Sequence, residues 1–407
     1  MKKYVILTFN VCNMGGGQLF VLRRALHLEK KGFDVCVITV FDNGVFPLKK
    51  SFGTIPIYNY PELSKTPSLL SKIKQERLMY SIIQKIGKGD EYYLESHTLE
   101  TIVWGELLSV KLRGRHLAYP LAEPRFNNIH FEPGKSIIKN KLSRGELYGN
   151  NSKSLEHIFE RTLNDNLFVN IAFDERELKE ICNPPIGYNK EEGDYVITTV
   201  SRLDKTYIEP FIDDVKKLSL KYPNQHFVLI IAGGSNTGTR EKDLIAKYGY
   251  SDIDNLRIIF TGYITELGKD IFKISNVFVG MGTASINAIS QKCIALNIDS
   301  SKSDKCSGIF GVDTNNFAYT ENGKIYSIYE KMEQIYLSTD EQIQLIITKG
   351  RKLYESSFEK TACFNQLDSV IESVQVSNDI PEYNVSVLYR IMVRFLCAMK
   401  NFVKRMR

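Results

Sequence analysis

Short apolar runs alternate with longer amphipathic stretches along most of this chain. Residues 3–9 and 34–40 are rich in β-branched and aromatic side chains, a pattern typical of buried strands. Between them, residues 18–31 place leucine and alanine at helical spacing, and Gly32 follows, as glycine often follows the last turn of a helix. The order strand, helix, strand predicts a βαβ unit with parallel strands.

The same alternation starts again after residues 182–193, a stretch rich in proline, glycine and charge that is typical of a linker. Residues 195–200 and 226–232 are predicted strands, and the second is apolar almost throughout, as in strands that are covered on both faces. A helical pattern joins them. We predict further strands at residues 91–97, 115–124, 256–261, 276–280 and 292–298, and helices at residues 98–112, 208–222 and 264–274.

This pattern predicts an α/β protein with two Rossmann-like, doubly wound domains. A length of 407 residues is sufficient for two cores. We expect an N-terminal domain over residues 1–185 and a C-terminal domain over residues 190–375. Residues 135–148 are basic and polar, and we expect them to form a mobile loop.

The stretch from Val385 to Arg407 has a different character, because it carries six Lys or Arg residues and no acid. The whole chain has a net charge of +6, so the rest sums to about zero and shows no bias toward nucleic acid. Apolar side chains fall on one side of a helix drawn through this stretch and cations on another. We therefore expect residues 382–407 to form a basic amphipathic helix on an anionic membrane. A helix that docks on the core or on a second subunit is the alternative.

The cysteines and the apolar runs indicate the compartment. Seven cysteines are scattered without a Cys-x-x-Cys pair, which argues against a zinc site and against a disulfide framework. The apolar run at the N-terminus is too short for a signal peptide, and no stretch is long and apolar enough to span a membrane. We expect a cytoplasmic protein, peripheral at the inner face of the plasma membrane.

The most informative stretch is Thr-Val-Ser-Arg-Leu-Asp-Lys at residues 199–205, where a predicted strand ends beside two cations, Arg202 and Lys205. Ligands of open α/β sheets bind beyond the carboxyl ends of the strands. Arginine grips phosphate oxygens as a planar fork and lysine as a point charge. The pair therefore indicates a diphosphate site, and two solvated surface cations are the alternative.

Two glycine-rich junctions are further candidates. At residues 280–290 a predicted strand ends in glycines and a helix begins, so that Gly282, Thr283 and Ser285 offer amides and hydroxyls to an anion. An ordinary strand–cap–helix junction has the same pattern. The earlier turn, with Gly16 and Gly17, is either a tight turn or a place where a ligand approaches the backbone. Its spacing is not Gly-x-Gly-x-x-Gly, which argues against a dinucleotide site.

His97 and Glu123 fall near the ends of successive predicted strands, where sites collect in this fold class. Each is a candidate to contact substrate. A buried structural histidine and a solvated glutamate are the alternatives.

The order of these segments resembles that of the GT-B glycosyltransferases, especially glycosyltransferase family 4, over about residues 1–370. The resemblance lies in the glycine turn at residues 15–17, His97 at a strand end, the stretch at residues 201–205, the Ile-Ala-Gly-Gly turn that contains Gly233, and the strand–helix–strand of residues 276–298.

The resemblance implies two domains that face a cleft, with a nucleotide-sugar donor, UDP- or GDP-linked, held mainly by the C-terminal domain. Arg202 and Lys205 would contact the donor diphosphate and stabilise the departing nucleotide, while His97 would face the transferred sugar. Two cations can replace the metal ion of other transferases, so no metal and no cofactor are expected. The residues implied to lie against the donor are Gly16, Gly17, Gly233, Gly282, Thr283, Ser285 and Asn287.

The sequence differs from the family at one position of consequence. The family usually carries two glutamates around the last strand–helix junction, and the second aligns with Asn287, which can bond a hydroxyl but has no charge. The first falls at about Val279, inside a predicted strand. A glycine-and-hydroxyl form of this junction also occurs in GT-B enzymes of cell-wall and teichoic-acid assembly.

The sequence thus predicts a glycosyltransferase of hexosyltransferase type that acts on a surface polysaccharide, such as a capsule, or on a lipid-linked glycan of the cell envelope. The alternative is a non-catalytic GT-B partner or chaperone subunit, which Asn287 favours and the two cations oppose. A sugar-nucleotide epimerase on the same fold would need acidic residues, and Glu123 is its candidate.

Overall fold

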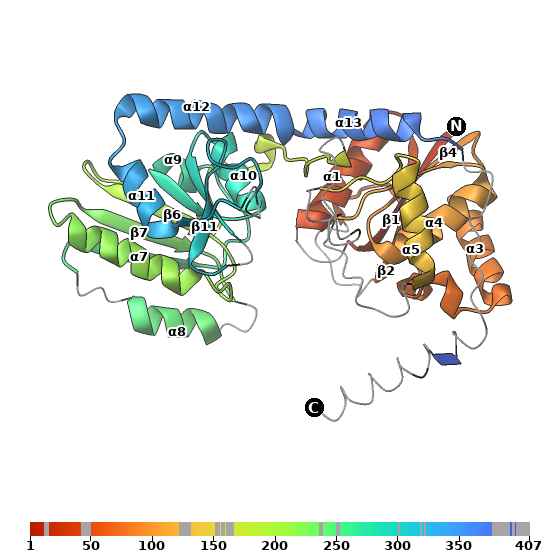
Figure 1. The fold of residues 1–407 in the computed structure, drawn as a ribbon, viewed down its shortest axis with the longest axis horizontal. Helices are drawn as coiled ribbons and strands as arrows, with labels where there is room; N and C mark the ends of the chain where they lie inside the picture. The colour runs from red at the N-terminus through yellow and green to blue at the C-terminus, as the bar shows by residue number, and fades with distance from the viewer. Residues whose placement is uncertain are drawn as a thin grey trace. The chain divides into compact units, whose positions relative to one another are not determined.

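The computed structural model describes residues 1–11, 16–41, 50–121, 132–150, 155, 159, 167–235, 239–249, 253–299, 302–317, 320, 323–376, 391, 392 and 395. Two compact units make up the chain (Figure 1). The first unit comprises Met1–Ala172 together with Cys363–Arg407, and the second comprises Phe173–Ala362. None of the described helices is long and apolar enough to cross a membrane.

The first unit is built on a parallel sheet with the order β3-β2-β1-β4-β5. Its central strand β1 is apolar because it is covered on both faces, and Tyr4, Val5, Ile6 and Leu7 are all buried. The strands are β1 (Lys2–Asn10), β2 (Asp34–Phe41), β3 (Ile57–Asn59), β4 (Glu91–Ser96) and β5 (Arg115–Ala118). The helices are α1 (Gly16–Lys30), α3 (Lys72–Ile86), α4 (Leu99–Leu112), α5 (Glu132–Ser143) and α13 (Lys360–Ser373).

The second unit has a seven-stranded sheet with the order β12-β11-β10-β9-β6-β7-β8, in which β6 to β10 run parallel, β11 pairs antiparallel with β10, and β12 pairs antiparallel with β11. Helix α7 packs against α11, and α10 packs against α12. The strands are β6 (Tyr195–Val200), β7 (Phe227–Ala232), β8 (Leu256–Gly262), β9 (Val277–Gly280), β10 (Ile294–Ile298), β11 (Lys305–Ile309) and β12 (Tyr326–Ser327). The helices are α7 (Ile208–Lys221), α8 (Thr239–Tyr248), α9 (Asp270–Ile274), α10 (Thr283–Ser290), α11 (Ile328–Tyr336) and α12 (Asp340–Ser357).

Both sheets confirm the predicted fold class, two Rossmann-like α/β domains. The predicted strand at residues 195–200 is β6, and the helices predicted at residues 18–31 and 208–222 are α1 and α7. Two predictions were wrong. Residues 135–148, expected as a loop, contain most of α5, and the helix predicted at residues 264–274 is confined to α9.

The division between the units also differs from the expected one. Residues 182–193 were predicted as the linker, but they belong to the second unit, where the Asn183 backbone amide donates to the Glu266 carbonyl at 2.9 Å. All but the first turn of α13 belongs to the first unit, although residues 190–375 were expected to form one domain. The reason is a set of buried hydrogen bonds from Arg24 of α1 to Phe364 and Asp368 of α13, which lie more than 300 residues away in the sequence.

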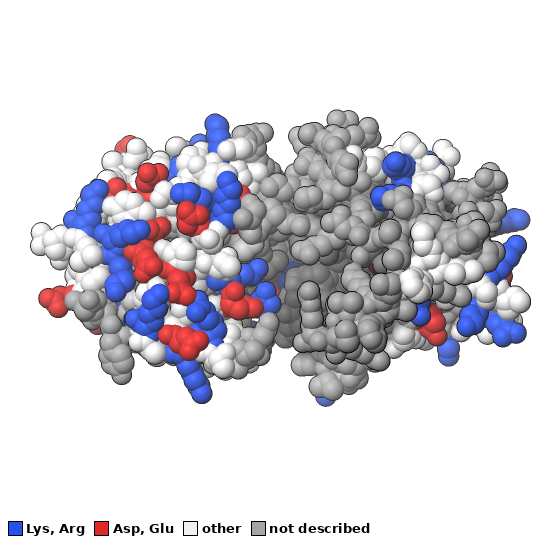
Figure 2. Space-filling model, turned by 60° about the horizontal axis from the view of Figure 1, so that its bottom comes forward, with Lys and Arg blue, Asp and Glu red and all other residues white. Residues whose placement is uncertain are grey.

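Charges on the second unit are mixed in sign. Figure 2 shows Lys and Arg interspersed with Asp and Glu on one face of this unit. On α7, for example, Glu209 pairs with Arg240 and with Lys247 of α8. Such a surface has no extended field of one sign, in keeping with the near-zero charge of the chain outside residues 385–407.

Candidate functional site

The parallel strands of the second unit bring two distant stretches together at the carboxyl edge of its sheet. Strand β6 lies between β7 and β9, with Val200 opposite Ala232 and Thr198 opposite Phe278. The loops that follow β6, β7 and β9 are therefore neighbours. The chain winds in opposite directions on the two sides of β6, which makes this the switch point where ligands of open α/β sheets bind.

The loop after β6 carries the two predicted cations. The buried Leu203 fixes this loop, since its amide donates to the carbonyl of Gly234 at 3.1 Å. The Arg202 side chain is 57% exposed, and its Nε lies 3.6 Å from Asp204 Oδ1. An exposed pair at this distance contributes little, roughly 0–1 kcal/mol, so the guanidinium can exchange Asp204 for an anionic ligand at low cost. Lys205 is half-buried at the end of the same turn.

Gly233 lets the loop after β7 pass directly beneath that loop. Its φ is 148°, and a Cβ at this position would lie 1.8 Å from the Ser201 carbonyl oxygen. Only glycine can therefore occupy the position without moving the backbone that carries Arg202. The structure thus gives Gly233 a steric role at the predicted site.

Helix α10 begins at the same edge with Gly282 as its N-cap. Because glycine has no side chain, Gly282 does not cap the backbone amides in the first turn of α10. Ser285 is fully buried and Asn287 is 7% exposed, yet Ser285 Oγ and Asn287 Oδ1 have no hydrogen-bond partner. Buried polar atoms are nearly always bonded, so these two atoms are candidates to bond a ligand.

Two further residues at this edge escaped the sequence analysis. Ser235, in the loop after β7, also has a buried hydroxyl without a partner. Tyr263 follows β8 with 65% of its surface exposed, and it lies against Gly234, where an added Cβ would be 3.2 Å from the Tyr263 Cβ. An exposed aromatic ring after a strand gives no sequence signal of its own. Only the sheet order brings it to the candidate site.

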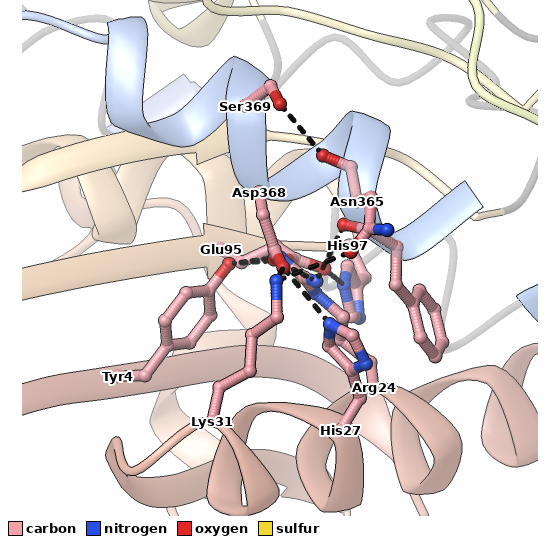
Figure 3. Close-up of polar contacts among 10 residues, drawn as sticks. Tyr4, Arg24, His27, Lys31, Glu95, His97, Asn365, Asp368 and Ser369 are labelled. Carbon is pink, nitrogen blue, oxygen red and sulfur yellow. Dashed lines mark hydrogen bonds and ion pairs between the residues drawn. The ribbon is translucent and has the colours of Figure 1, made fainter. Parts of the chain in front are cut away.

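In the first unit, the predicted residue His97 follows β4 and is 1% exposed. Its Nε2 lies 2.9 Å from Glu95 Oε1, whereas its Nδ1 has no partner (Figure 3). The rings of Phe20 and Tyr119 pack against the imidazole. His97 is thus fixed in place by Glu95 and the two rings, while its Nδ1 makes no hydrogen bond within the protein.

Glu95 belongs to a buried network that ties α1 to α13. Its carboxylate accepts hydrogen bonds from Tyr4 Oη at 2.5 Å and Arg24 Nε at 3.0 Å, and Arg24 also pairs with Asp368 of α13. Burial opposes ionisation of Glu95, but Arg24 and the hydrogen bonds from His97 and Tyr4 outweigh it and lower the pKa of Glu95 to about 2. The carboxylate is therefore charged at neutral pH.

A second histidine network in the first unit has the residue types of a hydrolytic triad, but it is buried where no substrate can reach it. His116 of β5 lies 3.0 Å from Glu106 Oε2 and 2.9 Å from Ser96 Oγ, and all three are fully buried. A Cβ on Gly105 would lie 2.4 Å from both the imidazole and the hydroxyl. No substrate fits against this serine, so the network is structural.

The remaining predicted residues are placed as follows. Gly16 and Gly17 open α1, and a Cβ on Gly17 would make only ordinary contact, 3.8 Å from the Leu121 side chain. Thr283 is the first residue of α10. Glu123 lies outside the described residues. Among the residues that the structure describes, no group of three or more His, Cys, Asp or Glu side chains is arranged to hold a metal ion.

No protein-family model matches the sequence, and no curated protein matches it either. Solved structures match it in fold. A glycosyltransferase from Rickettsia africae ESF-5 is 16% identical with a TM-score of 0.59, over 91% of this chain and 98% of that one. TarM is 12% identical with a TM-score of 0.59, over 92% and 99%. Sucrose-phosphate synthase from Thermosynechococcus elongatus is 12% identical with a TM-score of 0.58, over 91% and 98%. These likenesses show that the chain has the GT-B fold of glycosyltransferases.

Proposed function

We propose that this protein is a glycosyltransferase that moves a sugar from a UDP- or GDP-linked donor to a glycan acceptor. The observation that carries the proposal is the carboxyl edge of the second unit. There a cationic loop, an uncapped helix N-terminus and buried polar atoms without partners occupy the switch point of one sheet. The fold supports it, since a TarM variant from S. aureus was solved with UDP and alpha-GlcNAc-glycerol.

In this proposal Arg202 and Lys205 bind the donor diphosphate. Glycosyl transfer leaves negative charge on the diphosphate as the bond to the sugar breaks, and cations already in place stabilise that charge. The amides of the first turn of α10 add partial positive charge. Because the two side chains supply the neutralisation, transfer does not depend on an added metal ion.

The polar atoms without partners bind the rest of the donor. Ser285 Oγ, Asn287 Oδ1 and Ser235 Oγ each gain a hydrogen bond that the unliganded protein lacks. Asn287 accepts from a donor hydroxyl without the charge of a glutamate. The exposed ring of Tyr263 provides a face on which the nucleobase stacks. Gly16 and Gly17 at the start of α1, and His97, act on the sugar side.

The test is nucleotide binding and release. We expect UDP or GDP to bind in a calorimetric titration, and one sugar nucleotide of a panel to release its diphosphate with acceptor. Arg202→Ala lowers transfer by about 100-fold, equivalent to about 3 kcal/mol of leaving-group stabilisation. The control is Lys217→Ala, which removes a surface cation paired with Asp214 of α7. An Arg202→Ala variant with full activity would remove this residue from the mechanism.

A non-catalytic partner subunit is the second candidate, and Asn287 in place of the family's glutamate favours it. A partner subunit that has lost donor chemistry predicts no binding of either nucleoside diphosphate. The same titration therefore separates the two candidates before any acceptor is known.

We further propose that the acceptor is a surface polysaccharide or a lipid-linked glycan of the cell envelope, and that the protein works at the inner face of the plasma membrane. The support is the cationic, apolar stretch at residues 385–407, most of which lies outside the described residues. Each cation close to an anionic membrane contributes about 1 kcal/mol to binding.

A further inference from the structure

The amino edge of the sheet in the second unit carries a cavity of about 320 Å³. Strands β6 and β10 begin at this cavity with Tyr195 and Ile294, and the end of α11 and the start of α12 cover it. Its volume falls within the range of small-molecule sites, roughly 300–1,000 Å³. Strand β6 has 6 residues, so at about 3.3 Å per residue the cavity lies about 20 Å from the loop that carries Arg202. The cavity is therefore separate from the candidate donor site.

The wall of the cavity is formed mostly by rings and branched aliphatic side chains. The rings of Tyr195 and Tyr336 stand nearly perpendicular, with their centroids 5.1 Å apart. Ile343 and Ile347 lie one turn apart on α12, and both line the cavity. Burial raises the pKa of the Cys293 thiol to about 12, so this group lines the cavity in its neutral form. Such a wall suits a flat apolar body of about one or two rings.

Two residues of opposite charge also line the cavity. Lys292, in the turn between α10 and β10, and Asp340, the first residue of α12, are its charged members among the described residues. Both are exposed, and within the part of the chain that the structure describes neither forms an ion pair. One free cation and one free carboxylate at the same cavity fit a ligand that carries both charges.

We propose that this cavity binds a small zwitterion with an apolar ring, for which an aromatic α-amino acid is the simplest example. The ligand carboxylate pairs with Lys292, its ammonium group pairs with Asp340, and its ring packs against the tyrosines and isoleucines of the wall. All of these residues belong to the second unit. The inference does not rest on the proposed function, because the opposite edge of the sheet takes no part in it.

Lys292 occupies a backbone position that glycine usually holds. Its φ is 60°, in the left-handed region, and its amide donates to the Ile289 carbonyl at 3.2 Å. The next amide, that of Cys293, donates to the Ala288 carbonyl at 3.0 Å, which completes a Schellman turn at the end of α10. Lys292→Gly therefore removes the cation and keeps the turn favourable.

Each charge can be removed with a matched control. Arg113 also has a positive φ, 52°, at the end of α4 in the first unit, so Arg113→Gly is the control for Lys292→Gly. Asp340→Asn removes the carboxylate, while the reciprocal cap of α12 stays intact. Its control is Glu341→Gln, because Glu341 lies in the same first turn but does not line the cavity.

The experiment is NMR of the full-length protein labelled with ¹³C at the isoleucine methyl groups. We expect L-tryptophan to shift the signals of Ile343 and Ile347 with a Kd of about 1 mM or lower. The signal of Ile245 on α8, outside the cavity, should stay unchanged. Indole-3-propionate lacks the ammonium group and tryptamine lacks the carboxylate, so each should bind about 5-fold more weakly. The same spectra show whether each variant is folded.

The variants assign the two charges. Lys292→Gly should weaken the binding of L-tryptophan and indole-3-propionate about 5-fold and leave that of tryptamine unchanged, because tryptamine has no carboxylate. Asp340→Asn should weaken the binding of L-tryptophan and tryptamine and leave that of indole-3-propionate unchanged. Both control variants should bind all three compounds like the wild type.

Isoleucine signals that do not respond to L-tryptophan would overturn the inference. So would equal affinity for the three compounds, or a Lys292→Gly or Asp340→Asn variant that binds all of them like the wild type. These results leave the proposed function standing, because the nucleotide titration tests it separately. Displacement of L-tryptophan by UDP also overturns the inference, since the cavity would then not be a site of its own.

Discussion

Ser285 shows at the level of one residue how a missing hydrogen bond marks a candidate binding site. The side chain is fully buried at the start of α10, and its hydroxyl has no partner. A protein selected only for stability would place alanine there, since burying a hydroxyl without a bond is unfavourable. The hydroxyl is therefore better explained by a ligand than by the fold.

This leads to a first prediction. Ser285→Ala should leave the free energy of unfolding the same or raise it by about 1 kcal/mol, because the unsatisfied hydroxyl is removed. The same change should weaken binding of the nucleoside diphosphate by up to about 10-fold, or 1.4 kcal/mol. Urea unfolding and calorimetric titration measure the two effects on one preparation.

The opposite pattern would show that the hydroxyl stabilises the fold. Ser290→Ala in the same helix serves as the control, because the Ser290 hydroxyl is already bonded to the Asn287 carbonyl at 2.7 Å. That variant should lose stability and keep its affinity for the nucleotide.

A second prediction at the level of one residue concerns His116 and the pH dependence of stability. Burial, together with the nearby cation of Lys141, lowers the pKa of His116 to about 4, against 6.5 for an exposed histidine. Between these values the unfolded chain binds a proton that the folded chain does not, so stability falls as the pH falls. We expect a loss of about 2 kcal/mol from this group between pH 7 and pH 5.

The measurement is the free energy of urea unfolding at both pH values in wild type and in His116→Gln. The difference between the two proteins isolates this residue from the other histidines. A wild type whose pH dependence matches that of the variant would show that the pKa of His116 does not differ between the folded and unfolded chains. Glu106, whose pKa is lowered by His116 and Lys141 against the effect of burial, adds its own loss only at more acidic pH.

At the level of elements, the loops after β6 and β7 depend on one another. The Ser201 amide donates to the Ala232 carbonyl, the Leu203 amide donates to the Gly234 carbonyl, and Gly233 passes beneath the Ser201 carbonyl. The cations of the first loop are therefore positioned by the backbone of the second.

We predict that Gly233→Ala disturbs both loops. Its Cβ would lie 1.8 Å from a backbone oxygen, and its φ of 148° is unfavourable for alanine. The expected cost is about 2–4 kcal/mol of stability from overpacking and strain, together with a loss of nucleotide binding. Thermal unfolding measures the loss of stability, and calorimetric titration measures the loss of nucleotide binding.

Gly187→Ala is the matched control, since Gly187 has a φ of 74° and an added Cβ would meet nothing within 4 Å. It should cost only the backbone strain of about 1 kcal/mol and leave binding unchanged. Equal losses in the two variants would mean that the close approach at Gly233 does not position the cationic loop.

The sequence predicted those elements whose local pattern agrees with their final environment. Strand β7 is apolar because both its faces are covered, and α7 alternates with the spacing of a half-buried helix, so both were found. Helix α5 was missed because its lysines suggested a solvated loop. Lys141 is in fact fully buried and donates to Glu146 at 2.8 Å. Its other acidic partner, Glu106, lies on α4, and a local pattern does not reveal such a partner.

Some residues of the candidate site were likewise predictable from the sequence, and others were not. Arg202 and Gly282 follow strands of clear pattern, so their position at the carboxyl edge was predictable. Glu95 was not singled out, because its importance comes from Arg24 and Asp368, far away in the sequence. The unpartnered atoms of Ser235 and Asn287 become visible only when every neighbour is in place.

At the level of the whole molecule, the charge is concentrated in one stretch. Residues 385–407 hold six cations, equal to the net charge of the chain, and no acid. We predict that full-length protein binds vesicles containing phosphatidylglycerol and that a form ending at residue 384 does not. With about 1 kcal/mol for each cation near the surface, the loss should exceed 100-fold. Co-sedimentation measures the fraction of each form that binds the vesicles, and neutral phosphatidylcholine vesicles are the control.

Equal binding by the shortened form would assign membrane contact to another part of the protein. A form in which Arg390, Arg394 and Lys400 are replaced by glutamine separates charge from apolar contact. It should bind anionic vesicles more weakly than wild type, and added salt should affect it less.

The place of Asp368 has a consequence for how a ribosome makes this protein. Arg24 emerges early, but its acidic partner on α13 emerges only after the entire second unit has been translated. Until then, one side of a buried guanidinium faces water or a chaperone instead of a carboxylate. The second unit can mature as soon as it leaves the exit tunnel, whereas the first, although begun earlier, is completed later.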